Sequence, residues 1–201
     1  MKKAKDKNSQ KIKNINKKNS ILDPVLEWCE TLVAAVFVVI FCFTFIFRIA
    51  VVDGHSMEST LFENDRLIVS HLFYTPKQGD IVVIESEVLD KMIIKRIIAV
   101  GGQHVEIDYN ADSVTVDGRA VEEDYVNYHH MSDTGSFSEE FYDSDRDVYE
   151  YDVPQDCVFV LGDNRNHSAD SRTIGFVPTE DIVGKAELRF YSERAKLGRL
   201  E

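Results

Sequence analysis

The chain has few of the residues that mark several common classes of protein. Four prolines and ten glycines among 201 residues exclude low-complexity and collagen-like sequence. Three cysteines cannot form the disulfide framework of a small secreted domain. Cys29 and Cys42 lie in or beside an apolar run, and Cys157 is predicted to be a buried strand residue because no neighbour marks it as an activated thiol. Stability must therefore come from a hydrophobic core, for which the 44% of hydrophobic residues suffice.

Positive charge is scarce over most of the chain. Residues 49–201 hold 14 Lys and Arg side chains against 31 Asp and Glu, a formal charge of −17. Such a domain would be repelled by the phosphates of nucleic acid, so no nucleic-acid partner is expected. The first twenty residues carry eight lysines against one acid, Asp6. This tail precedes an apolar run, which suggests the headgroups of a lipid bilayer as its partner.

One run is long enough to cross a membrane. Residues 31–47 are seventeen residues without a charge, and residues 49–52 extend the run to just over twenty, with Arg48 able to reach the headgroups. A cleaved signal peptide is the alternative, but it should have a shorter core and end in a small-x-small site, whereas this run ends in bulky residues. An uncleaved anchor is favoured.

The lysines upstream of the run predict its orientation, because positive flanks stay on the cytoplasmic side. The expected arrangement is a cell-membrane, single-pass protein. Residues 1–25 form a basic cytoplasmic tail, 26–50 the transmembrane anchor, and 51–201 an extracytoplasmic β-rich domain in which 122–156 is an acidic surface excursion.

Short β-rich runs separated by turn signals predict a mainly antiparallel β-sheet or barrel-like domain. The hairpin signal is Asp117-Gly118, within 114–121. The other predicted strands are 66–69, 80–84, 92–100, 157–161 and 183–190.

Ser56 and Lys95 are the residues that carry chemistry. A serine hydroxyl is a weak nucleophile until a base removes its proton, and a lysine can serve as that base only when burial favours its neutral form. Ile93 and Ile97 would share a strand face with Lys95, which predicts an apolar environment. The alternative, that Lys95 and Arg96 are an exposed stripe on an edge strand, stays open from sequence alone.

A third block, residues 162–172, is dense in hydrogen-bonding side chains directly after a predicted strand. Its acidic and basic residues could pair to fix the loop, and Ser168 or Ser171 could orient an amine; an ordinary surface turn is the alternative. The paired residues would be Asp163, Arg165, Asp170 and Arg172.

A serine–histidine–aspartate triad is the competing site. His55 adjoins Ser56, and neighbours in a strand point to opposite faces, so it is badly placed as a base. The remaining histidines show no triad or metal-ligand spacing, including the adjacent pair His129 and His130. No metal and no organic cofactor are expected.

Together these blocks resemble type I signal peptidases, membrane-anchored serine–lysine proteases that remove signal peptides from exported proteins. The resemblance runs from the anchor to about Ala186 through 54–61, Gly79-Asp80, Lys95-Arg96 and 162–172, followed by 175–178. The second oxyanion donor that some relatives carry two residues before the serine is Gly54 here, which resembles the Gram-positive pattern.

The resemblance implies roles for individual residues. Ser56 would be the nucleophile, with its backbone N–H in the oxyanion hole, Lys95 the general base, and Ser168 the residue that orients the Lys95 amine. Asp163, Arg165, Asp170 and Arg172 would brace the loop. The substrate pockets for the −1 and −3 residues would involve Leu61, Ile93 and Ile94.

Two positions depart from the family pattern. Ser59 stands where the family usually has proline, and Gly101-Gly102-Gln103 stands where it usually has Pro-Gly-Asp. Both hint at altered loop rigidity or a dedicated substrate.

The sequence therefore predicts a signal peptidase I-type serine endopeptidase that cuts exported precursors after small residues, Ala-x-Ala-like. Three alternatives remain. The first is a specialised peptidase serving pilins or a few other precursors. The second is a non-catalytic membrane-anchored assembly factor, against which the presence of both Ser56 and Lys95 counts. The third is a self-cleaving repressor with a similar dyad, which the anchor and the absence of a DNA-binding segment disfavour. The particular precursors and the oligomeric state are not indicated by the sequence.

Overall fold

A computed structural model of the chain describes residues 24–41, 44, 46–72, 74–126, 131–133 and 136–200. The predicted basic tail, apart from its last two residues, and the pair His129 and His130 lie outside these ranges. The described chain divides into two units at Ile46 and Phe47.

Within the described residues of the N-terminal unit, one helix of 18 residues runs over Pro24–Phe41. Proline suits the first position of a helix because its missing N–H would have no partner there. At 1.5 Å per residue the helix is about 27 Å long, close to the thickness of a bilayer core. Its large apolar side chains are exposed, among them Leu32 at 65% and Phe37 at 67%. The helix is thus long and apolar enough to cross a membrane, as a single-pass anchor requires.

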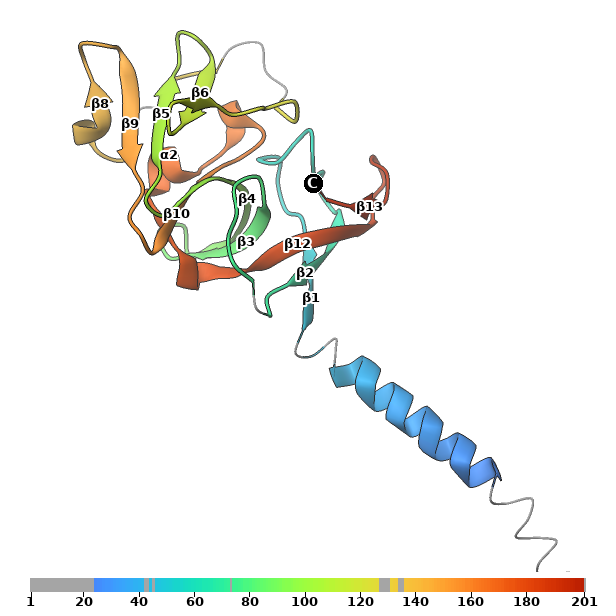
Figure 1. Cartoon of the computed structure of the whole chain (residues 1–201). Helices are drawn as coiled ribbons and strands as arrows, with labels where there is room; N and C mark the ends of the chain where they lie inside the picture. Colours follow the sequence, from blue (N-terminus) through green and yellow to red (C-terminus); the bar gives the residue numbers. More distant parts are fainter. Residues whose placement is uncertain are drawn as a thin grey trace, which may run out of the picture. The chain divides into compact units, whose positions relative to one another are not determined.

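The second unit consists of two antiparallel sheets (Figure 1). Sheet A has eight strands in the order β1-β2-β12-β3-β4-β10-β11, with β13 beside β12, and sheet B has the order β7-β6-β5-β9-β8. The strands are β1 (Phe47–Val51), β2 (Arg66–Ser70), β3 (Ile81–Ser86), β4 (Lys91–Val100), β5 (His104–Asp108), β6 (Ser113–Val116), β7 (Arg119–Ala120), β8 (Tyr142–Asp143), β9 (Val148–Asp152), β10 (Cys157–Leu161), β11 (Val177–Pro178), β12 (Ile182–Tyr191) and β13 (Gly198–Arg199). The helical turns are η1 (Glu139–Phe141), η2 (Arg165–His167), α2 (Ser171–Ile174) and η3 (Thr179–Asp181). The prediction of a mainly antiparallel β fold, preceded in the sequence by one apolar helix, is confirmed.

Three clusters of buried side chains form the core. One joins sheet B to β10 and includes Tyr151 and Phe159, both 0% exposed. A second lies beneath the turn that carries Ser56 and includes Met57 and Leu61. The third packs on β3, β4 and β10 and includes Ile93.

Two segments differ from their sequence-based description. Residues 47–50, assigned above to the anchor, belong to β1, which pairs with all five residues of β2. The acidic segment 122–156 contains β8 and β9, and β9 pairs with β5 and buries Val148 and Tyr151. That segment therefore supplies core as well as surface, because its tyrosines and valine offer apolar area between the acids.

Register places the polar loop 162–170 over β4. Leu161, the last residue of β10, pairs with Arg96 of β4, and the loop begins at the next residue. On its other side β4 pairs with β3, where Lys95 lies opposite Val82. The loop and the Lys95 strand are therefore neighbours, and the Ser56 turn joins them because Asn164 N of the loop donates to Ser56 O.

Candidate active site

Ser56 lies in the turn that follows β1. The turn is held from below by Met57 and Leu61, which are 2% and 0% exposed, and by a hydrogen bond of 2.8 Å from Leu61 N to Met57 O. Gly54 has φ +90°, a conformation that side chains disfavour, so glycine is needed for the chain to turn here. The Ser56 carbonyl oxygen accepts a hydrogen bond of 3.0 Å from Asn164 N, which ties the turn to the loop after β10.

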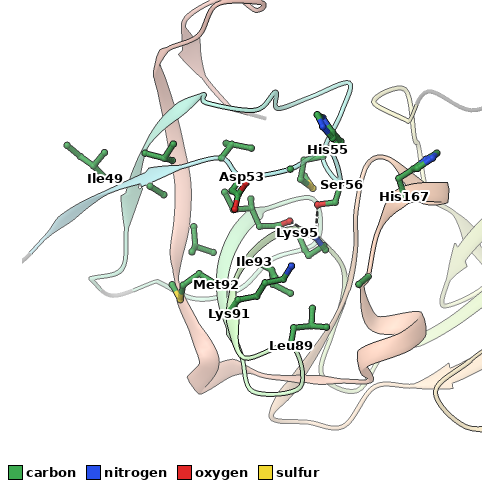
Figure 2. Close-up of a pocket in the computed structure, with 18 residues that line it drawn as sticks. Ile49, Asp53, His55, Ser56, Leu89, Lys91, Met92, Ile93, Lys95 and His167 are labelled. Atoms are coloured by element: carbon green, nitrogen blue, oxygen red, sulfur yellow. Dashed lines mark hydrogen bonds between the residues drawn. The ribbon is translucent and has the colours of Figure 1, made fainter.

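Lys95 points at Ser56 across the cleft (Figure 2). A hydrogen bond of 2.8 Å joins Lys95 Nζ to Ser56 Oγ, and Nζ also donates to Ile94 O at 3.0 Å. Lys95 is 3% exposed and Arg96 is 2% exposed, so the two residues are not an exposed stripe.

The environment of Lys95 favours its neutral form. Burial lowers the pKa of this amine from 10.5 to about 8, while the negative charge of Asp170 acts in the opposite direction. A lysine in this state can accept a proton near neutral pH.

Asp170 and Arg172 form a buried pair at the start of α2. Arg172 donates to both carboxylate oxygens of Asp170, at 2.8 and 2.9 Å, and both residues are at most 1% exposed. Asp170 also accepts from Gly162 N at 3.0 Å, and Arg172 donates to Arg165 O at 2.6 Å. The pair therefore fixes both ends of the loop.

A second buried pair, Asp163 with Arg96, joins the loop to β4. Arg96 donates to the two oxygens of Asp163 at 2.9 and 2.8 Å, and its guanidinium stacks over Tyr125 at 3.9 Å from the ring centroid. Thr60 Oγ1 donates to Asp163 at 2.5 Å, which links the loop to the Ser56 turn. Arg96 is adjacent to Lys95 in the sequence, but its pairing with Asp163 could not be predicted, because the two are 67 positions apart.

Arg165 and Gly162 complete the loop. Arg165 donates to Gly162 O at 3.1 Å and is also hydrogen-bonded to Glu123. A Cβ on Gly162 would lie 2.2 Å from Ser168 Oγ and 2.5 Å from Ser56 O, so any side chain here would push the two apart. The sequence placed Gly162 at the start of the polar block 162–172 but did not indicate its role, because that role is a close approach between distant segments.

Ser168 is close to the site but is not bonded to Lys95. Its Oγ is buried and has no hydrogen-bond partner among the residues that the structure describes. Ser171, the other candidate, accepts a hydrogen bond of 2.9 Å from Val160 N and so holds α2 against β10. The orienting role of Ser168 stays a prediction.

A cleft of about 480 Å³ opens beside Ser56 and Lys95. Ile93 and Ile94 line it, together with Val52, which was not expected there. Contact of Ile93 and Ile94 with a substrate stays a prediction. Leu61 does not line this cleft and lies in the core cluster beneath the turn.

The two histidines that line the cleft are engaged elsewhere. His55 Nδ1 lies 3.0 Å from Glu58 Oε1, and His167 Nδ1 lies 3.3 Å from Asn164 Oδ1. Among the described residues, the hydrogen bond of the Ser56 hydroxyl is to Lys95, and no bond to either histidine accompanies it.

Both departures from the family pattern have structural partners. Ser59 Oγ donates to Tyr125 O at 2.9 Å. Gln103 accepts from Val100 N at 3.0 Å and donates to Asp117 at 2.9 Å, so it joins the β4–β5 turn to the β6–β7 turn.

The chain was compared with known proteins. A family model described as "Signal peptidase, peptidase S26" matches residues 25–191. "Signal peptidase I P" of Bacillus subtilis subsp. natto is 35% identical over 190 residues, covering 89% of this chain and 94% of that protein. "Signal peptidase IB" of Staphylococcus aureus (strain COL) is 32% identical over 175 residues, covering 83% and 90%. A crystal structure of a signal peptidase I from Enterococcus faecalis V583 is 29% identical with a TM-score of 0.42, covering 56% of this chain and 97% of that one.

Proposed function

Because the chain belongs to the signal peptidase family, peptidase S26, we propose that it is a membrane-anchored serine endopeptidase with Ser56 as nucleophile and Lys95 as general base. Its substrates are exported precursors, whose signal peptides it removes after small residues.

One observation carries this assignment, namely the 2.8 Å contact between Lys95 Nζ and Ser56 Oγ in a site where Lys95 is 3% exposed. With a pKa of about 8, roughly a tenth of the amine is neutral at pH 7. A lysine at 10.5 would be neutral about 300-fold less often. Burial thus provides a neutral amine that can act as a base near neutral pH, which a lysine exposed to water would rarely provide.

The reaction follows from this geometry. The neutral Lys95 amine takes the Ser56 proton as Oγ attacks the scissile carbonyl, and the negative charge that develops on the carbonyl oxygen is held partly by the Ser56 backbone N–H. The resulting Lys95 ammonium gives its proton to the leaving amine. The same amine, neutral again, takes a proton from water as the water attacks the acyl-enzyme, and returns that proton to Ser56 Oγ as the signal peptide is released.

Specificity for small residues is supported by the apolar lining of the cleft. In an extended peptide, residues two apart point to the same side, so the −1 and −3 residues face one wall together. Ile93 and Ile94 would contact them. We assign Leu61 to the packing beneath the turn, because it is 0% exposed.

The anchor and the loop have supporting roles. We propose that the lysine-rich tail is cytoplasmic and the β domain extracytoplasmic, so that enzyme and precursor meet at one bilayer surface at high effective concentration. Asp163, Arg165, Asp170 and Arg172 position the loop, and Ser168 is proposed to orient Lys95 during the reaction.

The test is cleavage of a precursor with an Ala-x-Ala site by the full chain in detergent, beside Ser56→Ala, Lys95→Met and Lys77→Met. The last variant removes an equal charge from an exposed residue as a control. Loss of cleavage in the first two variants alone supports the dyad, and kcat/KM should rise with pH through about 8. Equal cleavage by all four proteins would refute it.

The same experiment separates the alternatives. A wild-type protein that cuts only a pilin-like or other single precursor would be a dedicated peptidase, and one that cuts only itself would be an autoprotease. A folded protein that binds precursors and cuts none would be an assembly factor.

A further inference from the structure

A second lysine, Lys91, lies in the same cleft as Lys95. Both are on β4, four residues apart, and alternate residues of a strand share a face, so Lys91, Ile93 and Lys95 form one row. All three line the cleft, and Figure 2 shows the Lys91 side chain directed along the cleft toward Lys95. Lys91 itself is exposed, at the open end of the row.

The positive charge of Lys91 is not offset by a partner. It forms no hydrogen bond or ion pair with the residues that the structure describes, whereas Lys185 is paired with Asp80 at 2.7 Å. An uncompensated ammonium in a cleft with apolar walls acts on other charges there more strongly than it would in open water.

Several other charged or titratable groups line the cleft or act on Lys95 through their charge. The two carboxylates in the loop after β10 are each bound by an arginine, which offsets most of their charge. The groups are Asp53 and His55 from the Ser56 turn, His167 from η2, and Asp163 and Asp170 from the loop. The pKa of Lys95 is influenced most by burial and next by the charge of Asp170. Repulsion from the Lys91 ammonium comes third, and it lowers the pKa of Lys95.

We propose that Lys91 is a positioning residue whose charge favours the neutral form of Lys95 and so extends cleavage to lower pH. The proposal rests on the function proposed above, since it concerns the base of that reaction. Lys91 does not touch the reacting atoms and acts only through Lys95.

The expected effect follows from Coulomb's law. At a separation of about 10 Å and the dielectric constant of water, removal of one unit charge should raise the pKa of Lys95 by about 0.3 unit. Cleavage at pH 7, where the neutral amine is the minor form, should then fall about twofold. Because the Debye length is about 3 Å in 1 M salt, the effect should nearly vanish there.

The test compares Lys91→Met, Lys91→Gln, Lys91→Arg and Lys77→Met in the full chain in detergent. The titration of Lys95 is read directly from its rate of acetylation by acetic anhydride as a function of pH, measured at that residue by mass spectrometry without substrate. The pH profile of kcat/KM is measured on the same proteins.

The proposal expects the two neutral variants at 91 to raise the pKa of Lys95 in low salt, with Lys91→Arg and Lys77→Met unchanged. It is overturned if the neutral variants leave the titration where it is, as a pure substrate-contacting role would, or if Lys91→Arg shifts it equally, as a packing role would. Since acetylation needs no cleavage, a wild-type protein without peptidase activity would refute the proposed function while the influence of Lys91 on Lys95 is still measured.

Discussion

Replacing Lys95 by methionine should stabilise the protein in a way that depends on pH. Below pH 8 the wild-type amine is protonated in both the folded and the unfolded chain, and folding forces that charge into an apolar site. With a pKa of about 8 in the folded protein against 10.5 for an ordinary lysine, the cost is about 3 kcal/mol. Between pH 8 and 10.5 the unfolded chain keeps a proton that the folded chain has released, so wild-type stability rises with pH there. Methionine has a similar length and no charge, so Lys95→Met should lose this pH dependence.

The measurable quantity is the difference in free energy of unfolding between Lys95→Met and wild type. That difference should shrink by about 2 to 3 kcal/mol from pH 6 to pH 10. At pH 10 the folded wild type no longer buries a charged Lys95, so the substitution has little cost left to remove. Urea unfolding of the full chain in detergent would be followed by near-ultraviolet circular dichroism, since the single tryptophan, Trp28, lies in the N-terminal helix and reports little on the β domain. Lys77→Met is the control. A difference that stays flat across this range would show that Lys95 titrates as an exposed lysine, and the argument for a neutral base would fail.

Three further substitutions test the framework of the site. Gly162→Ala should reduce cleavage at least tenfold, because its Cβ would lie 2.5 Å from the carbonyl oxygen of Ser56. Measuring both kcat and the melting temperature will show whether the fall in kcat is larger than the loss of stability explains. Arg172→Met should cost about 3–5 kcal/mol in urea unfolding because it leaves Asp170 buried without its partner, whereas Arg146→Met in an exposed ion cluster should cost less than about 1 kcal/mol. Gln103→Ala should lower stability by about 1 to 2 kcal/mol, since it removes two hydrogen bonds between turns, and leave kcat unchanged; a change in kcat would contradict a purely structural role.

The sequence was most informative where local pattern decides the structure. The strand predicted at 157–161 coincides with β10, because a short apolar run bounded by polar turns leaves little choice of end points. The ends of β1 could not be predicted in the same way. Its residues continue the apolar run of the anchor, and their pairing with β2, some twenty positions later, is what makes them a strand.

In the candidate site, too, local sequence could identify some residues, whereas others depend on long-range strand pairing. Ser56 and Lys95 could be named from residue type and from the apolar neighbours of Lys95. The ion-pair partner of Arg96 could not be named from the sequence, because Asp163 comes near Arg96 only through the pairing of β10 with β4. Ser168 shows the converse, since its position in the polar block suggested a hydrogen bond to Lys95 that the structure does not contain.

The place of β12 in sheet A has a consequence for when the site can form. This strand comes near the end of the chain, yet it lies between β2 and β3, two strands from the first half of the domain. From β12, Arg189 also donates to Thr60 O at 2.7 Å and so holds the turn that carries Ser56. During synthesis β2 and β3 therefore have a gap between them until β12 is made. The Ser56 turn gains its contact with Arg189 only then, so the framework of the candidate site is complete only after β12 has joined sheet A.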